Sequence, residues 1–289
     1  MYDTVLVPTD GSAGAETAAG HAFDLAAAFE AEVIVLSVVD EGPVGTAIAE
    51  RRETLERAAR EAVEAVERAA DPALSVRTTV ERGRPHETIC EYAEREGVDL
   101  VAMGTHGRTG LDRLLIGSVA ERVVRTSPVP VLTARGDSDG TSGADDPAYG
   151  SVLLPVDGSE ASEAAVEHAL AVAERYDATV HVLSVIDAEA LAGASSIGMS
   201  VPDVVEDLET EREAVVDPVV DRCERRGIDA VTRVEQGTPH RTIDAYVDEA
   251  DIDLVTMGTH GRTGLDRYLL GSVTDRVIRT SAAPVLTVR

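Results

Sequence analysis

The chain has 289 residues, which is enough for two domains of ordinary size. It carries 53 acidic residues against 26 basic ones, all of them arginine, and its formal net charge is −27. This acidity excludes general binding to a nucleic acid backbone, which requires a basic surface, and it opposes docking on anionic membranes. An apolar fraction of 44% is nevertheless high enough to build buried cores.

In the first half of the chain, short and often β-branched apolar runs alternate with longer amphipathic segments. The apolar runs predict five strands, at Thr4–Pro8, Glu32–Val39, Ser75–Glu81, Leu100–Met103 and Val129–Ala134. The longer segments predict four helices, at Ala13–Phe29, Thr46–Ala70, Pro85–Glu96 and Ser118–Thr126. Strands that alternate with helices predict an α/β fold with a parallel, doubly wound sheet.

An internal repeat predicts the domain organisation. Residues 4–12 return as residues 151–159, and residues 103–135 return as residues 257–289 with 25 of 33 positions identical. Residues 136–150 lie between the copies and are rich in Gly and Asp, which is typical of a flexible linker. We therefore predict a first domain over residues 1–135, a linker over 136–150 and a second domain over 151–289.

Several classes of site and location are not supported by the sequence. Cys90 and Cys223 occupy unmatched positions in the repeat, so we expect neither a disulfide framework nor a zinc site, and no metal-ligand spacing is present. No run approaches the roughly 18 apolar residues of a membrane helix. The first residues lack the basic-then-apolar pattern of a signal peptide. We expect a cytoplasmic protein.

A glycine-rich loop gives the strongest functional signal. Gly104-Thr105-His106-Gly107 is followed after nine residues by Gly117-Ser118, and the same spacing recurs from Gly258 to Ser272. The first glycines follow a predicted strand and the Gly-Ser pair opens a predicted helix. Glycines let backbone N–H groups approach a phosphate, and a helix N-terminus attracts anions, so the pattern predicts a phosphate site.

A structural interpretation of the same residues stands beside this one. Ser118 with Glu121 matches a capping box, Ser272 with Asp275 is close to one, and the glycines alone are compatible with a turn. The two interpretations are compatible, because a capped helix can still receive a phosphate. The chain has no P-loop motif, and no Gly-x-Gly-x-x-Gly follows the first strand.

With these motifs, the chain resembles a tandem universal stress protein of the UspA family, in the branch that binds ATP. The family motif Gly-x2-Gly-x9-Gly-[Ser/Thr] matches both loops, and the resemblance covers both copies. It implies two five-stranded sheets of order 3-2-1-4-5, with a nucleotide bound where the strand order reverses, between strands 1 and 4. It also implies ATP, ADP or AMP as ligand, with Mg²⁺ held mainly by the phosphates.

The resemblance implies roles for individual residues of both copies. Backbone and hydroxyl groups would hold the phosphates at Gly104, Gly107, Gly117, Ser118 and Val119, and at Gly258, Gly261, Gly271, Ser272 and Val273. Asp10 and Asp157 would contact the ribose or adenine side. The adenine pocket would be lined by Pro8, Thr9, Val38 and Met103 in the first copy and by Pro155, Val156, Val185 and Met257 in the second. The change from Thr9 to Val156 removes a hydroxyl, so the pockets are expected to differ slightly in polarity.

Charged residues within the loops have two interpretations each. His106 and His260 either contact a phosphate or lie on an exposed loop, and Arg108 and Arg262 either pair with phosphate oxygens or are solvated. We keep all four as candidate binding residues. The paired His21 and His168 are expected to have packing or surface roles in the first helix of each copy.

The resulting hypothesis is a nucleotide-dependent stress sensor or switch with two sites per chain. The alternative is an enzyme on the same fold, a slow ATPase or a nucleotidyl transferase, and a third hypothesis is a nucleotide-free scaffold. The sequence contains no Ser-His-Asp or Cys-His arrangement that marks a nucleophile. The fifth predicted strands are expected to pair in an intrachain pseudo-dimer, with homodimerisation as a further expectation. Lysine-free acidity is typical of a salty cytosol, such as that of a halophilic archaeon.

Overall fold

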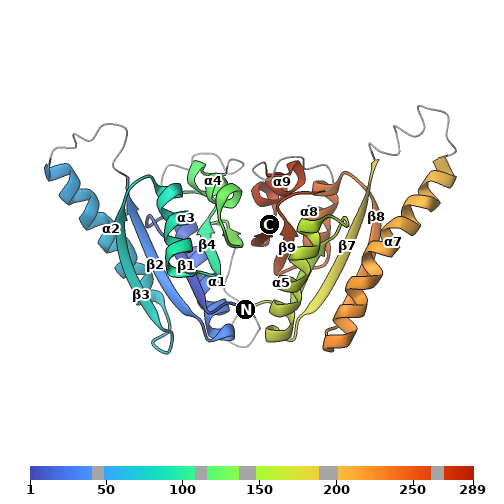
Figure 1. Ribbon diagram of the computed structural model, residues 1–289, viewed down its shortest axis with the longest axis horizontal. Coiled ribbons are helices and arrows are strands. Elements are labelled where there is room, and N and C mark those ends of the chain that lie inside the picture. Colours follow the sequence, from blue (N-terminus) through green and yellow to red (C-terminus); the bar gives the residue numbers. More distant parts are fainter. Residues whose placement is uncertain (41–48, 108–115, 137–147, 189–200, 262–269) are drawn as a thin grey trace. The chain divides into compact units, whose positions relative to one another are not determined.

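The computed structural model describes residues 1–40, 49–107, 116–136, 148–188, 201–261 and 270–289, and the side chains of 49–51 and 201–203 are outside its description. The chain divides into two compact units, Met1–Ala148 and Tyr149–Arg289 (Figure 1). Most of the expected linker, residues 137–147, lies outside the described residues. Each unit is an α/β domain in which helices cover a parallel sheet.

The first unit alternates strands and helices along the whole described chain. Its strands are β1 (Thr4–Pro8), β2 (Glu32–Val39), β3 (Val76–Arg82), β4 (Leu100–Gly104) and β5 (Val131–Ala134). Its helices are α1 (Ala13–Phe29), α2 (Ala49–Ala69), α3 (Pro85–Glu96) and α4 (Ser118–Thr126).

The second unit repeats this succession. Its strands are β6 (Ser151–Pro155), β7 (Thr179–Asp187), β8 (Ala230–Gly237), β9 (Leu254–Gly258) and β10 (Val285–Val288). Its described helices are α5 (Glu160–Tyr176), α7 (Val201–Arg226), α8 (Pro239–Glu249) and α9 (Ser272–Thr280).

The strand order reverses once within each unit. The first unit has the order β3-β2-β1-β4-β5 and the second has β8-β7-β6-β9-β10, with parallel pairing throughout each. In the first unit, β2 therefore lies on one side of β1, and β4 lies on its other side. A crevice forms at such a point, outside the carboxyl ends of the two central strands.

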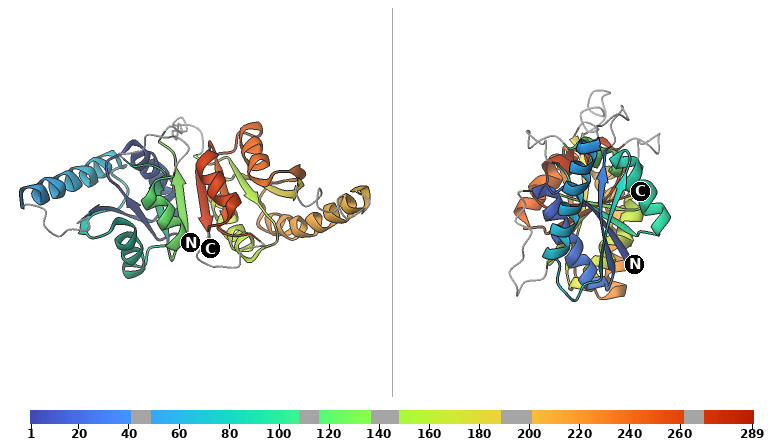
Figure 2. Two further views of the ribbon diagram at one scale, coloured as in Figure 1. Left: turned by 90° about the horizontal axis from the view of Figure 1, so that it is seen from above. Right: turned by 90° about the vertical axis from the view of Figure 1, so that its left-hand side faces the viewer.

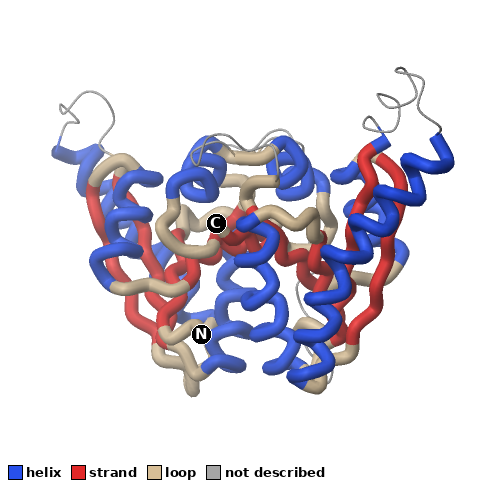
Figure 3. Tube along the Cα trace, turned by 45° about the vertical axis from the view of Figure 1, so that its right-hand side comes forward, coloured by secondary structure: helices blue, strands red, loops and turns tan. Residues whose placement is uncertain are grey.

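Helices cover both faces of each sheet, as Figures 2 and 3 show. In the first unit, α1 packs on β1, β4 and β5, whereas α2 packs on β2 and β3. Right-handed crossovers place α3 and α4, which pack against each other, on the opposite face. Because both faces are covered, the central strands are apolar along their whole length, as the sequence predicted.

The core consists of the central strands and the inner faces of the helices. Leu6, Ile34, Leu36 and Leu100 are fully buried in the first unit, and Leu153 and Leu183 in the second. Four of the aromatic residues form two matched pairs: the ring centroids of Tyr2 and Phe29 lie 4.9 Å apart in an edge-on arrangement, and those of Tyr149 and Tyr176 lie 5.1 Å apart. Repetition of this pair indicates that the two units share their packing as well as their topology.

Three of the predicted strands have boundaries that differ from the structure, and the second helix ends at Ala69 instead of Ala70. The fifth strand begins at Val131 instead of Val129, because the N–H of Val129 donates to Ser127 Oγ at 3.2 Å and Pro130 has no N–H to give. The fourth strand extends to Gly104, which pairs with Ala134. The third runs from Val76 to Arg82, one residue later than predicted at each end. Residues 46–48 of the predicted second helix lie outside the described residues.

Candidate functional site: the crevice at the strand reversal

The turn after β1 directs Asp10 to the edge of the sheet. Gly11 has a positive φ of 74°, and the N–H of Ser12 donates to Asp10 Oδ1 at 3.1 Å. Ser12 then caps α1 by accepting a hydrogen bond from the N–H of Ala15. The short turn therefore fixes the carboxylate of Asp10 beside the N-terminus of α1.

The glycine loop after β4 is packed against this same helix. A Cβ at Gly104 would lie 2.5 Å from the backbone carbon of Gly14, so only glycine permits this approach. The hydroxyl of Ser12 donates to the carbonyl of His106 at 3.3 Å. The β1 turn and the glycine loop are thus joined across the crevice, although 94 residues separate these two partners in the sequence.

Gly107 and Gly117 bring the loop close to Asp10 and to the start of α4. A Cβ at Gly107 would lie 2.7 Å from Asp10 Oδ2. The N–H of Gly117 donates to the carbonyl of Thr105 at 2.7 Å, which closes the loop at its base. These contacts hold a carboxylate, a glycine backbone and a helix N-terminus in one small region.

The capping-box prediction for α4 is wrong. The N-cap is Gly117, with an extended backbone and no side-chain hydrogen bond to the helix, and Ser118 is already the first helical residue. A serine inside the helix no longer has the geometry that lets its hydroxyl accept from the first turn. Gly271 and Ser272 have the same arrangement at α9. The first-turn N–H groups of both helices are therefore not satisfied by a capping side chain.

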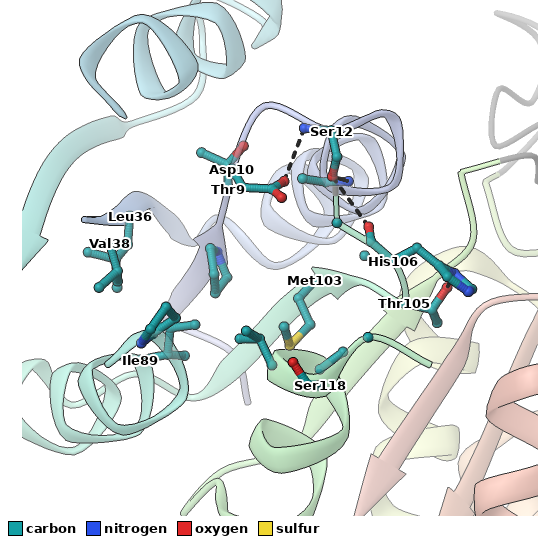
Figure 4. Close-up of a pocket in the computed structure, with 18 residues that line it drawn as sticks. Thr9, Asp10, Ser12, Leu36, Val38, Ile89, Met103, Thr105, His106 and Ser118 are labelled. Atoms are coloured by element: carbon teal, nitrogen blue, oxygen red, sulfur yellow. Dashed lines mark hydrogen bonds between the residues drawn. The ribbon is translucent and has the colours of Figure 1, made fainter. Parts of the chain in front are cut away.

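A cavity of about 280 Å³ lies between these elements (Figure 4). Its lining includes the apolar side chains of Val38, Ile89 and Met103, and Figure 4 shows Ser118, at the start of α4, beside Met103 with Asp10 on the opposite side. Among its described lining residues, only Asp10 and His106 carry ionisable side chains. The cavity thus joins an apolar wall to a wall of backbone donors, and it has little charge of its own.

The structure brings the predicted residues of the first copy together. The described ones all line the cavity, namely Pro8, Thr9, Asp10, Val38, Met103, Gly104, His106, Gly107, Gly117, Ser118 and Val119. Arg108 lies outside the described residues. The sequence interpretation missed seven further lining residues: Ser12, Ala15, Leu36, Pro85, Ile89, Thr105 and Ala120. The position of Ile89 on the buried face of α3 was a usable signal, whereas the others depend on how the elements pack.

His106 lines the cavity with its imidazole directed elsewhere. In Figure 4 the ring turns away from Asp10 and Met103, and its Nδ1 lies 2.9 Å from Thr105 Oγ1. His260 has the same contact with Thr259 Oγ1, at 2.8 Å. The repeated histidine thus makes the same local bond within the loop in both units.

The second unit reproduces the loop geometry. The N–H of Ser159 donates to Asp157 Oδ1 at 3.0 Å, and a Cβ at Gly261 would lie 2.8 Å from Asp157 Oδ2. The N–H of Gly271 donates to the carbonyl of Thr259 at 2.8 Å. Pro155, Met257 and Gly258 lie at the ends of β6 and β9, Val185 lies near the end of β7, and Ser272 and Val273 open α9. Arg262 lies outside the described residues.

The two units differ at the residue before the aspartate. Thr9 Oγ1 accepts a hydrogen bond from the N–H of Gly11 at 3.1 Å, and Val156 in the second unit has no hydroxyl to do so. Both side chains are buried, at 5% and 4% exposure. The missing hydroxyl therefore changes the bonding of the turn itself.

Comparison with known proteins identifies the family. Residues 1–135 and 148–289 each match the Universal stress protein family. The chain belongs to the universal stress protein family. A universal stress protein of Mycolicibacterium smegmatis is 30% identical over 300 aligned positions, which cover 99% of this chain and 96% of that protein. Tandem organisation is therefore shared along the full length of a relative.

A solved structure of a universal stress protein supports the fold. The crystal structure of a universal stress protein from Archaeoglobus fulgidus aligns over 100% of this chain and 99% of the Archaeoglobus chain, with a TM-score of 0.74 and 23% sequence identity. Another universal stress protein, solved in complex with cAMP, is 27% identical over 47% of this chain and 98% of its own, with a TM-score of 0.35. In the part of the universal stress protein that our structure describes, no helix is long and apolar enough to cross a membrane.

Proposed function

We propose that this universal stress protein binds an adenine nucleotide, ATP or its products ADP and AMP, in each of its two units. The observation that carries the proposal is the cavity between β1 and β4, which joins an apolar wall to an uncapped helix N-terminus. An adenine ring suits the wall formed by Val38, Ile89 and Met103. Phosphates suit the N–H groups of the first turn and the positive dipole end of α4.

The individual roles follow from this orientation. Gly107, Gly117, Ser118 and Val119 bind the phosphates, mainly through backbone N–H groups. Asp10 lies between the two ends of the cavity and accepts hydrogen bonds from the ribose hydroxyls. Gly104 lets α1 approach the loop closely enough to support it. The corresponding residues of the second unit take the same roles, with Asp157 on the ribose and Gly261, Gly271, Ser272 and Val273 on the phosphates.

Magnesium would arrive with the nucleotide. The described cavity residues offer one carboxylate, Asp10, and otherwise neutral hydroxyl, imidazole and backbone groups. Mg²⁺ binds through phosphate oxygens and waters when a site supplies so few carboxylates. The chemistry that the ion supplies is neutralisation of phosphate charge, and this chain's own residues bind and orient the nucleotide.

The biological role that we propose is a cytoplasmic sensor or switch with slow or no turnover. Asp10 is the one carboxylate of the described cavity, and the imidazole of His106, which contacts Thr105 Oγ1, turns away from Asp10. We also propose that the fifth strands pair the two units into a pseudo-dimer within one chain, because an apolar parallel edge strand requires a partner. The lysine-free acidity suits a salty cytosol, as in a halophilic archaeon.

Mass spectrometry of the natively purified chain tests the binding proposal. The expected result is an adenine nucleotide carried by the protein, or bound after addition, with two ligands per chain at saturation. Absence of any adenine nucleotide binding by calorimetry would contradict the proposal. Steady release of phosphate or pyrophosphate that the double variant Asp10→Ala, Asp157→Ala abolishes would instead support the enzymatic alternative.

A further inference from the structure

The second helix of each unit provides a basis for comparing the two sites. Helices α2 and α7 pack on the equivalent strands β2 and β7, and each ends three residues after its last buried position. Buried residues recur with spacings of three and four in both, at Ala59, Ala62 and Val66 in α2 and at Val216, Val219 and Cys223 in α7. In this alignment Arg212 is the counterpart of Leu55, because Leu55 lies four residues before Ala59 and Arg212 lies four residues before Val216.

The side chains at these equivalent positions differ in chemistry and placement. Leu55 is 40% exposed at the surface of α2. Arg212 is half-buried, its Nε is shielded from solvent, and its Nη1 donates to the backbone carbonyl of Asp157 at 3.3 Å. The second unit therefore places a guanidinium at the carboxyl end of β6, whereas the equivalent position of α2 in the first unit carries an exposed leucine.

Arg212 is not required to shape the Asp157 turn. In the first unit Asp10 makes the same bond to the N–H two residues later, at 3.1 Å against 3.0 Å for Asp157. The approach of the carboxylate to the loop glycine is also the same, at 2.7 Å for Gly107 and 2.8 Å for Gly261. The turn thus forms in the first unit without an arginine at the equivalent position, so shaping the turn does not account for Arg212.

We propose that Arg212 makes the second site selective for an adenine nucleotide that carries a phosphate on its ribose, at the 2′ or 3′ position, besides the 5′ phosphate. This inference rests on the proposed function, which places the ribose at Asp157. The guanidinium then lies beside the ribose, whereas the 5′ phosphates occupy the glycine loop. A planar guanidinium fork binds phosphate oxygens in a bidentate manner, which leucine cannot do.

The test measures each site separately in the full-length chain. Gly107→Ala blocks the first site and Gly261→Ala blocks the second, because each added Cβ meets the adjacent aspartate oxygen. Calorimetry compares AMP with adenosine 2′,5′-bisphosphate and adenosine 3′,5′-bisphosphate, which add one ribose phosphate. At the second site, at least one bisphosphate should bind about tenfold more tightly than AMP, because one charge-assisted hydrogen bond accounts for an increase in affinity of about this size. At the first site the added phosphate should give no gain.

Variants of the same helix then assign the preference to Arg212. Arg212→Leu, which introduces the residue of the first unit, should remove the bisphosphate-to-AMP preference. Arg225→Leu makes the same change of charge at an exposed position bonded within α7 and should keep it. Leu55→Arg should confer the preference on the first site. Circular dichroism and gel filtration confirm that each variant is folded.

The possible failures are distinguishable. If AMP binds but neither bisphosphate binds the second site better, or if Arg212→Leu keeps the preference, the role of Arg212 is wrong and the proposed function survives. If no adenine nucleotide binds either site, the proposed function and this inference are both wrong.

Discussion

Two glycines of the first loop are restricted by different neighbours. Gly104 faces the backbone of Gly14 in α1, so its lack of a side chain serves packing. Gly107 faces the carboxylate of Asp10 across the crevice, so its lack of a side chain keeps the binding region open. The same motif therefore contains one residue that we assign to stability and one that we assign to ligand binding.

We predict that Gly107→Ala removes one nucleotide site and that Gly107→Ala with Gly261→Ala removes both. The added methyl groups would lie 2.7 and 2.8 Å from the oxygens of Asp10 and Asp157. An overpacking cost of about 1–3 kcal/mol corresponds to binding that is roughly 5-fold to 150-fold weaker. Calorimetric stoichiometry measures the effect. Two sites of unchanged affinity in the double variant would show that the loops do not bind the ligand.

We predict that Gly104→Ala lowers the free energy of unfolding by about 1–3 kcal/mol, because its Cβ would overlap the backbone of Gly14. Gly20→Ala is the matched control, since a Cβ at Gly20 meets nothing within 4 Å and alanine favours the α1 helix by about 1 kcal/mol. Urea unfolding of the full chain measures both changes. Equal stability of the two variants would contradict the role of Gly104.

At the scale of elements, the helices that follow the strands differ in how they begin. Helices α1 and α5 each start with a serine that caps the first turn, whereas α4 and α9 start after a glycine with no capping side chain. The uncapped pair are the helices that the glycine loops lead into. Local sequence suggested caps at α4 and α9 as well, through Ser118 and Ser272, so the difference arises from the backbone at Gly117 and Gly271.

Helix α1 contains a buried histidine that predicts pH-dependent stability. Burial lowers the pKa of His21 from 6.5 to about 4, and burial also lowers the pKa of the matching His168 in α5. The folded state therefore favours neutral His21. Its contribution to stability is present above pH 6.5 and is lost as the pH falls towards about 4, by up to roughly 3 kcal/mol.

Urea unfolding of the wild type and of His21→Leu across this pH range checks the prediction. The wild type should lose more free energy of unfolding between pH 7 and about pH 4 than the variant does. The carboxylates titrate in both proteins, so the comparison isolates the histidine. Parallel pH profiles would show that His21 does not contribute in this way.

At the scale of the whole molecule, the charge and the sites oppose each other. The chain has a formal net charge of −27, and the proposed ligand is a polyanion. The described cavity in the first unit contains no basic side chain other than His106. The described part of the site therefore offers mainly backbone N–H groups at short range, against a repulsive long-range field.

We predict that ATP binding is maintained or strengthened when salt is raised from about 0.1 M to about 1 M, because the screening length falls from about 10 Å to about 3 Å. Repulsion by the whole chain is then screened, whereas hydrogen bonds from the loops remain. Calorimetry in KCl with excess Mg²⁺ measures the dissociation constant. Binding that occurs only in dilute salt would show that exposed charges, rather than backbone donors, hold the ligand.

Much of the fold was predicted correctly from local sequence patterns, and the predictions that were wrong have identifiable physical causes. The predicted β1, β2, α1, α3 and α4 match the structure because apolar periodicity and buried strands leave little choice of register. The fifth strand was predicted to begin two residues too early, because the residues around Pro130 are apolar like those of a strand. Pro130 itself lacks the backbone N–H that strand pairing uses. The loop glycines were recognised by spacing, whereas lining residues such as Leu36 and Pro85 were not, since no motif includes them.

The sequence by itself determined the duplication, the alternation of strands and helices and the spacing of both glycine loops, because these are properties of neighbouring residues. Only the tertiary structure decided which distant groups meet. It joined Ser12 to His106, placed Gly107 against Asp10, left α4 without a side-chain cap and set Arg212 beside Asp157. The physical reason is that such contacts depend on how strands and helices pack in three dimensions, and residues far apart in the chain carry no local signal of their neighbours.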